Sequence, residues 1–332
     1  MIYHIAPYAD NAGDIVIVDA CQKLFRQIDP DIMEIEDWRE DKRKYNHAKA
    51  VFVGGGGMFI PDTKPNKTSG WRWNITTRQM SKIKVPLIGY AIGFNKFRDQ
   101  DDFHPNFKAS LNNMIRQASF FGMREKSGID RLIRYTHYTD MIAWQPCPAQ
   151  FGKMLYPHIG PTVKQPYLVF APAMDRPHLR GDISAIIPAL RYAVLLGWKL
   201  KIAAHIAADK EIITMLDDID YKFVDLRGKP ADEIMQFYAN AGCVIGMRLH
   251  SLLIPFGMGI PIIPVISHDK ITDWLSDINQ PDWGVELRDP GLNQRLMFRI
   301  DNFKLHTDLE ARSMMWKVTK WNMEYIKAVI DG

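Results

Sequence analysis

The residues whose types and spacing point most directly to chemistry are Arg248 and His250. They lie two positions apart in the segment GMRLHS, directly after an apolar run that is typical of a buried strand. A helix is expected to begin at about Ser251, and the amide groups of a helix N-terminus favour an anion. A lone histidine is usually structural, whereas a histidine beside cations at strand ends is more typical of a site. The pair therefore predicts a site for a small anion, where His250 can act as a general acid or base near neutral pH.

Lys270 and Arg124 add positive charge near other strand ends. Lys270 ends the segment Ser267-His268-Asp269-Lys270, which follows the next apolar run, so we expect it on a loop adjacent to Arg248. Arg124 follows another apolar run and opens a helix. An arginine in that position can bind a carboxylate or a phosphate through parallel hydrogen bonds. The alternative for Arg124 is an ion pair with Glu125 at the surface.

Asp14 follows Gly13 at the first turn from strand to helix. In a parallel sheet this turn lies at the carboxyl end of the strand, where ligands bind. Asp14 is predicted either to orient a catalytic group or a substrate hydroxyl, or to serve only as the N-cap of the helix.

The glycine run Gly54–Gly57 and the segment 62–74 are further candidates for ligand contact. Gly55 and Gly56 would let the backbone approach a ligand closely, or would only relieve a steric conflict. The run matches neither nucleotide-binding glycine pattern in its expected context. Segment 62–74 is basic and carries Trp71 and Trp73, whose faces suit the apolar C–H faces of sugar rings. A surface loop without that role is the alternative.

Short apolar runs alternate along the chain with amphipathic segments, which predicts an α/β fold with parallel, doubly wound sheets. Several of the runs lack polar alternation, as expected for strands covered on both faces. The predicted strands are Tyr3–Ala6, Ala50–Val53, Pro86–Ile92, Ser119–Met123, Tyr167–Ala171, Lys199–Ala204, Lys222–Asp225, Cys243–Gly246 and Pro261–Ile266. The predicted helices are Asp14–Ile28, Pro105–Gln117, Glu125–Tyr135, Asp182–Leu196, Asp209–Leu216, Ala231–Ala241, Leu249–Phe256 and Thr307–Asp331.

A proline-rich stretch from Gln145 to Pro166 interrupts this alternation and suggests a domain boundary. We therefore expect a first domain over residues 1–150, a linker over 151–166 and a second domain over 167–305. Residues 306–332 should form a C-terminal helix that packs back on the first domain. The mixture of tryptophan, tyrosine and lysine in that helix leaves a membrane-surface face as an alternative.

Composition limits the classes of protein that fit. The 332 residues include 47% hydrophobic ones, enough for buried cores, and the net charge of +4 is too small for a nucleic-acid binder. Cys21, Cys147 and Cys243 lack the spacing of a disulfide framework or a zinc site. No signal peptide or run of 18 apolar residues is evident. We therefore expect a cytoplasmic protein without a transmembrane segment.

Taken together, these segments resemble the polysaccharide pyruvyl transferase family. The resemblance rests on Gly13-Asp14, the glycine run, Arg124-Glu125 with Ser127, the segment Arg248-Leu249-His250-Ser251, and Lys270 after the next strand. It implies a GT-B-like architecture, in which Rossmann-like domains face each other across a cleft. It also implies transfer of pyruvate from phosphoenolpyruvate to a sugar of a cell-surface glycan.

On this resemblance His250 and Asp14 are the expected catalytic residues. The donor phosphoenolpyruvate would be bound by Arg124, Arg248, Lys270 and Ser251, and the acceptor sugar would contact Gly55, Gly56, Trp71 and Trp73. Desolvated charge must be paired, which explains several cations around so small an anion. We expect neither a metal nor a cofactor.

The acceptor could be lipid-linked, which would place the protein at the inner face of the plasma membrane. The alternatives are a glycosyltransferase of the same fold that uses a nucleotide sugar, and a non-catalytic protein that binds glycans or anions.

Overall fold

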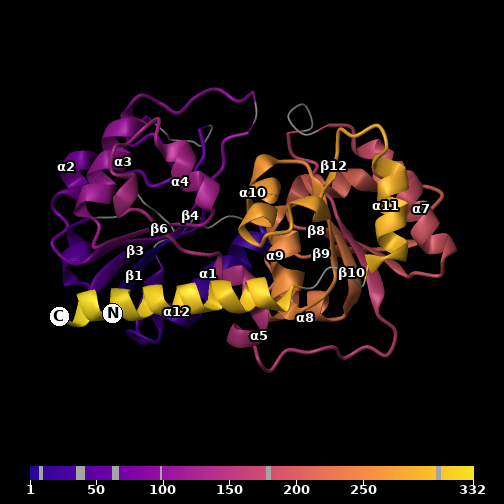
Figure 1. Ribbon diagram of the computed structural model, residues 1–332. Coiled ribbons are helices and arrows are strands. Elements are labelled where there is room, and N and C mark those ends of the chain that lie inside the picture. Colours follow the sequence, from indigo (N-terminus) through magenta and orange to yellow (C-terminus); the bar gives the residue numbers. More distant parts are fainter. Residues whose placement is uncertain (7–9, 35–41, 62–66, 98, 177–180, 304–307) are drawn as a thin grey trace. The chain divides into compact units, whose positions relative to one another are not determined.

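The computed structural model describes residues 1–6, 10–34, 42–61, 67–97, 99–176, 181–303 and 308–332. The chain divides into two compact units, each described here by itself. Unit 1 comprises residues 1–8, 17–148 and 313–332, and unit 2 comprises residues 9–16 and 149–312. Over the described ranges each unit contains a six-stranded parallel sheet with helices against it (Figure 1). The predicted fold class, α/β with doubly wound sheets, is therefore confirmed.

The sheet of unit 1 has the strand order β2-β1-β3-β4-β5-β6 among the residues described. Its strands are β1 (Ile2–Ile5), β2 (Ile32–Glu34), β3 (Ala50–Phe59), β4 (Leu87–Phe94), β5 (Phe120–Met123) and β6 (Ala143–Trp144). The helices around it are most of α1 (Ala12–Phe25), η1 (Lys42–His47), α2 (Thr77–Met80), α3 (Asn106–Gln117), α4 (Lys126–Leu132), η2 (Thr139–Met141) and most of α12 (Leu309–Asp331).

The sheet of unit 2 has the order β12-β11-β10-β7-β8-β9 over the described part of the chain. The order reverses between β7 and β10, and a ligand crevice is expected at the carboxyl ends of strands beside such a reversal. The strands are β7 (Tyr167–Ala171), β8 (Leu200–Ala204), β9 (Tyr221–Asp225), β10 (Ala241–Gly246), β11 (Ile262–Ile266) and β12 (Val285–Glu286). The helices are η3 (Pro148–Gln150), α5 (Gly152–Leu155), η4 (Ile183–Ile186), α7 (Ile187–Leu195), η5 (Ala207–Met215), α8 (Ala231–Ala239), α9 (Leu249–Met258), α10 (Asp269–Asp277), η6 (Pro281–Trp283) and α11 (Leu292–Asp301).

The glycine run lies inside β3 and not in a loop after it, which corrects the prediction of a strand that ends at Val53. All ten residues of β3 are buried. A Cβ atom on Gly54 would collide with the carbonyl oxygen of Tyr90 on the neighbouring strand, and one on Gly55 would lie 2.8 Å from Cys21 Sγ. Gly54 and Gly55 also hold positive φ angles of 139° and 78°. Close packing within unit 1 thus accounts for these glycines, and the buried Gly55 and Gly56 offer no open surface to an acceptor.

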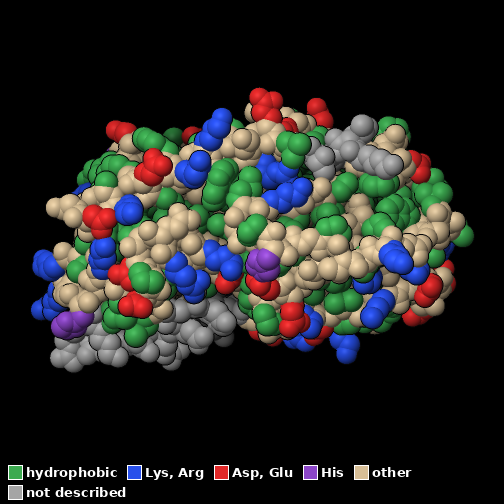
Figure 2. Space-filling model, turned by 90° about the horizontal axis from the view of Figure 1, so that it is seen from below, with side chains coloured by type: hydrophobic (Ala, Val, Ile, Leu, Met, Phe, Trp, Pro, Cys, Tyr) green, Lys and Arg blue, Asp and Glu red, His purple; other side chains and the backbone are tan. Residues whose placement is uncertain are grey.

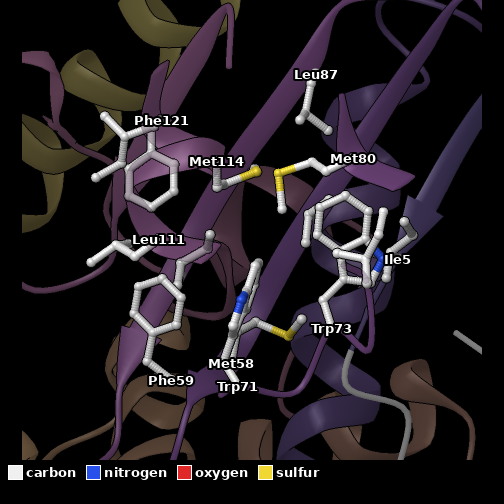
Figure 3. Packing of buried hydrophobic residues seen from close by; sticks show 14 of the residues in the cluster. Ile5, Met58, Phe59, Trp71, Trp73, Met80, Leu87, Leu111, Met114 and Phe121 are labelled. Carbon is white, nitrogen blue, oxygen red and sulfur yellow. The ribbon is translucent and has the colours of Figure 1, made fainter. Parts of the chain in front are cut away.

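Trp71 and Trp73 belong to the hydrophobic core of unit 1. Trp71 is 1% exposed and Trp73 is fully buried. Figure 3 shows both indoles among Met58, Phe59 and their neighbours, and the Trp71 Nε1–H donates a hydrogen bond of 2.8 Å to Ser110 Oγ. A buried indole has no face left for a sugar ring, so the predicted contact of these tryptophans with the acceptor is contradicted. Residues 62–66 of the same segment lie outside the described residues.

The C-terminal helix α12 contacts unit 1 from residue 313 onward. Asn322 Nδ2 donates to the carbonyl oxygen of Trp144 and to Gln145 Oε1, each at 2.9 Å. Lys49 pairs with Asp331 at 2.7 Å. Trp321 keeps 68% of its surface exposed. The segment 151–166, predicted as a linker, lies in unit 2 and includes α5. Residue 307, the predicted start of α12, lies outside the described residues.

Charged side chains of both signs are scattered among hydrophobic and other side chains on the face shown in Figure 2. Basic and acidic residues are interspersed there, as the small net charge of the chain suggests. In the described ranges, no helix is long and apolar enough to cross a membrane.

His4 makes the stability of unit 1 sensitive to acid. Its side chain is fully buried on β1, and Nε2 lies 3.3 Å from the carbonyl oxygen of Gly54. Burial disfavours the charged imidazolium and lowers the pKa of His4 from 6.5 to about 4. In the unfolded chain the pKa returns to its ordinary value. Between pH 6.5 and pH 4 the unfolded state therefore binds more protons, so the stability falls as the pH falls through this window.

We expect the free energy of unfolding to decrease by about 2 kcal/mol per buried histidine of this kind between pH 7 and pH 5. Denaturant titrations at these pH values measure the difference, and His4→Gln should flatten it. The matched control is His47→Gln, which changes an exposed histidine of the same unit. An equally steep pH dependence in His4→Gln would contradict this assignment.

Candidate functional site

Arg248 lies at the reversal point of the sheet in unit 2. It lies two residues after the end of β10 and directly precedes the first turn of α9. Its backbone is extended, with φ −107° and ψ 140°, so the chain bends there from strand into helix. The side chain is 12% exposed. Arg248 therefore brings a guanidinium and a helix N-terminus to the same edge of the sheet, as the sequence predicts.

Asp175 and Asp209 hold the guanidinium of Arg248. Asp209 accepts hydrogen bonds from Nε at 3.0 Å and from Nη2 at 2.5 Å, and Asp175 accepts from Nη2 at 2.7 Å. Burial by itself would lower the pKa of Arg248, but the nearby carboxylates outweigh burial and raise it above its usual value. Arg248 stays charged, and its charge is compensated within unit 2.

Asp209 is a buried carboxylate that links the carboxyl ends of β7, β8 and β10. Besides Arg248, it accepts hydrogen bonds from the backbone amides of Met174 at 3.2 Å, His205 at 3.0 Å and Ile206 at 3.1 Å. These groups follow β7 and β8, whereas Arg248 follows β10. Because Asp209 is fully buried, its contacts are shielded from water and from salt. One carboxylate thus fixes the backbone at the carboxyl ends of these strands.

His250 and Asp14 lie side by side in unit 2. His250 Nδ1 is 3.8 Å from Asp14 Oδ1, close enough for electrostatic attraction but longer than a hydrogen bond. Their side chains are 12% and 10% exposed. A Cβ atom on Gly13 would lie 2.6 Å from His250 Cβ, so glycine is required there. The amide of Ala12 donates to the carbonyl oxygen of His205 at 3.0 Å, which fixes the first turn of α1. The structure therefore brings together a histidine and a carboxylate that are far apart in the sequence.

Ser251 has a structural position. It is fully buried, and its hydroxyl donates to the carbonyl oxygen of Arg248 at 2.7 Å. The hydroxyl oxygen of Ser251 also accepts a hydrogen bond of 3.3 Å from the Arg248 amide. Ser251 is buried on the backbone of its own helix turn, and the contact between its hydroxyl and the donor stays a prediction. Ser251 stabilises the bend that carries Arg248.

Lys270 lies in the first turn of α10, directly after β11. His268 precedes that helix, and its Nδ1 accepts a hydrogen bond of 3.2 Å from the Lys270 amide. Ser267 donates to the carbonyl oxygen of Met247 at 2.7 Å, which joins the ends of β10 and β11. Lys270, Arg248 and His250 thus belong to the carboxyl ends of adjacent strands, β10 and β11.

Arg124 belongs to unit 1, where it follows β5. Its side chain is 3% exposed, and Nε pairs with Glu125 Oε1 at 2.5 Å. Gly93 makes room for the guanidinium, since a Cβ atom there would lie 2.7 Å from Arg124 Cζ. The structure therefore shows the predicted ion pair, but buried and not at the surface. The binding of donor by Arg124 stays a prediction.

Several residues of the site escaped the sequence analysis. Asp175 and Asp209 were not predicted as partners of Arg248, because they lie 73 and 39 positions away in the chain. His205 was also missed. It is fully buried 2.6 Å from the hydroxyl of Tyr238, and burial lowers its pKa to about 4. The only feature of the sequence that could have pointed to Asp175 and His205 is their position after the apolar runs that form β7 and β8. Among the described residues, no group of three or more His, Cys, Asp or Glu side chains is placed to hold a metal ion.

Comparison with known proteins gives one family and a set of similar folds. The family model described as polysaccharide pyruvyl transferase matches residues 11–270. No curated protein matches the chain significantly.

Among solved structures, a variant of the wall teichoic acid polymerase TagF matches with a TM-score of 0.54 at 11% identity, over 100% of this chain and 89% of that one. A glycosyltransferase from Rickettsia africae matches with a TM-score of 0.55 at 12% identity, over 99% and 98%. UDP-GlcNAc 2-epimerase from Neisseria meningitidis matches with a TM-score of 0.53 at 9% identity, over 98% and 99%. At these identities the likeness shows a shared GT-B-like fold and not a shared reaction.

Proposed function

The chain belongs to the polysaccharide pyruvyl transferase family, and from that premise we propose that it transfers the enolpyruvyl group of phosphoenolpyruvate to a sugar of a cell-surface polysaccharide or its precursor. The products are a pyruvate ketal on the sugar and free phosphate. The observation that carries the proposal is the segment Arg248-Leu249-His250-Ser251, which the fold holds at the reversal point of the unit 2 sheet.

The donor carries a carboxylate and a phosphate on three carbons, so its site must supply positive charge. Arg248, Lys270 and the N-terminus of α9 supply it at the ends of β10 and β11. We include Arg124 of unit 1 among the donor-binding residues because the family pattern includes it. The site is balanced by acidic partners, which suits recognition of one small anion better than of a long polyanion.

His250 is the proposed general acid. A sugar hydroxyl attacks C2 of phosphoenolpyruvate while His250 delivers a proton to C3, which saturates the double bond. The attacking hydroxyl gives its proton to the histidine or to Asp14. A second hydroxyl of the same sugar then bonds to C2, the C2–O bond to phosphate breaks, and the second proton leaves with phosphate. Atoms balance as one donor plus one diol giving one ketal plus phosphate.

The test is incubation of the full chain with phosphoenolpyruvate and a panel of sugar acceptors. We expect phosphate release that needs both substrates, together with a mass gain on the sugar that corresponds to one pyruvate ketal. Phosphate release without an acceptor is the control for simple hydrolysis of the donor.

A measurement of donor binding distinguishes this proposal from the alternative function, a glycosyltransferase of the same fold that uses a nucleotide sugar. A ligand that binds the native state raises the apparent stability by mass action. Phosphoenolpyruvate should therefore raise the melting temperature, while uridine and guanosine sugar nucleotides should not. Stabilisation by a sugar nucleotide alone would overturn the proposal in favour of the glycosyltransferase.

A further inference from the structure

The guanidinium of Arg248 is already bound by two carboxylates, which oppose the approach of an anionic donor. Arg248, Asp175 and Asp209 together carry one positive and two negative charges, and both carboxylates bond to the same nitrogen, Nη2. Arg176, which pairs with Asp175 at 3.4 Å, balances the charge of this group, but an anion brought to Arg248 still meets two carboxylates that already hold its guanidinium. The donor site is therefore not ready for an anion while both carboxylates hold their positions.

The carboxylates of Asp209 and Asp175 differ in how firmly they are held. Asp209 is fully buried and bonds to backbone amides after β7 and β8 as well as to Arg248. Its removal from the arginine would break these contacts as well. Asp175 has a side chain that is 22% exposed, and its other carboxylate oxygen pairs with the adjacent Arg176 at 3.4 Å. Because its side chain is partly exposed, Asp175 can turn toward water at a lower cost than the fully buried Asp209.

The backbone beside Asp175 supports this difference. Arg176 has a φ of 53°, in the left-handed region that residues other than glycine and asparagine rarely adopt. The ion pairs of Asp175 with Arg248 and Arg176 help to offset this conformational cost.

We propose that Asp175 is an exchangeable counter-ion, which occupies the solvent-facing side of Arg248 in the free protein and gives it up to an anionic group of the donor. Asp209 is the fixed counter-ion, which orients the arginine in both states. The inference rests on the proposed function, since it deepens the account of how the donor binds. It makes Asp175 a competitor of the donor and Asp209 a positioning residue.

The experiment measures binding of phosphoenolpyruvate and, separately, of inorganic phosphate to the full chain by calorimetry. For Asp175→Asn we expect the Kd of both ligands to fall by about fivefold to tenfold, as is reasonable for removal of one competing negative charge near a bound anion. The KM for donor should fall in parallel. Asp209→Asn should weaken binding instead, because the arginine loses its orientation.

The matched control is Asp218→Asn. Asp218 belongs to unit 2 and pairs with Arg191 at 2.6 Å, but it precedes β9 and so lies toward the opposite edge of the sheet. This variant removes the same charge and should change the Kd by less than twofold. Melting temperatures of the variants show whether each is folded.

The outcomes separate the inference from the proposed function. Unchanged or weaker binding in folded Asp175→Asn, with tight binding in the wild type, overturns the exchange of Asp175 and leaves the donor assignment intact. If phosphate binds more tightly to Asp175→Asn but phosphoenolpyruvate binds to neither protein, the counter-ion role stands and the proposed donor fails. If neither ligand binds any variant, both fail.

Discussion

Replacement of His250 by glutamine is expected to reduce the rate of pyruvyl transfer by about 10²- to 10⁴-fold, the usual contribution of a positioned general acid. Glutamine keeps a polar side chain in the first turn of α9 but cannot deliver a proton to C3 of the donor. Because the imidazole is not part of the carboxylate junction around Asp209, the fold and the affinity for phosphoenolpyruvate should change little. Steady-state phosphate release measures kcat, and calorimetry measures donor affinity.

The control for His250→Gln is His158→Gln, which changes an exposed histidine of the same unit. Gly13→Ala gives an independent route to the same residue, since the new methyl group would displace the His250 ring. It should lower kcat with an intact Asp14 and an intact imidazole. Transfer at the wild-type rate in His250→Gln would remove this residue from catalysis.

Replacement of Arg248 by methionine is expected to have the largest effect on stability. Methionine preserves much of the length of the side chain but leaves the buried carboxylate of Asp209 without its cation. Loss of one partner of a buried ion pair typically costs about 3–5 kcal/mol, because the remaining charge stays out of water. Denaturant titration measures this loss. The affinity for phosphoenolpyruvate should fall in parallel.

The double variant Arg248→Met/Asp209→Asn separates the charge effect from the loss of packing. Replacing the Asp209 carboxylate, which has lost its cation, should restore part of the stability. The effects of the two substitutions on the free energy of unfolding should therefore be non-additive by more than about 1 kcal/mol. Arg248→Lys keeps the charge but lacks the planar fork that reaches Asp175 and Asp209 together, so it should lie between wild type and Arg248→Met. Additive effects in the double variant would show that the carboxylate does not depend on Arg248.

The core strands were predictable because the apolar pattern that identifies each strand lies within the strand itself. A run such as Tyr167–Ala171 is apolar at every position, and the structure buries all five of its residues as β7. The edge strands β2, β6 and β12, of two or three residues each, were missed because so short a run has no recognisable period. The glycine run was misplaced because glycine is typical of turns, and only the close approach of Tyr90 and Cys21 explains glycines inside a strand.

Trp71 and Trp73 show a second limit of local pattern. Their neighbours in the sequence are basic and polar, which favours a surface loop, but burial depends on what packs against a residue. Met58 and Phe59 in β3 and Ser110 in α3 surround the indoles, and none of these contacts is visible from the segment itself. The apolar area of two indoles outweighed the polarity of the segment that carries them.

The sequence by itself determined the class of fold and the chemistry-bearing segment Arg248–Ser251, because strand pattern, helix start and residue type are all local properties. It also carried the resemblance that the family match confirms. The tertiary structure alone decided the electrostatic state of that segment. Asp209 and Asp175 reach Arg248 from 39 and 73 positions away, and Asp14 reaches His250 from the far end of the chain. Coulombic attraction and desolvation depend on distance and burial in space, so the partners of a charge become known only when the chain is folded.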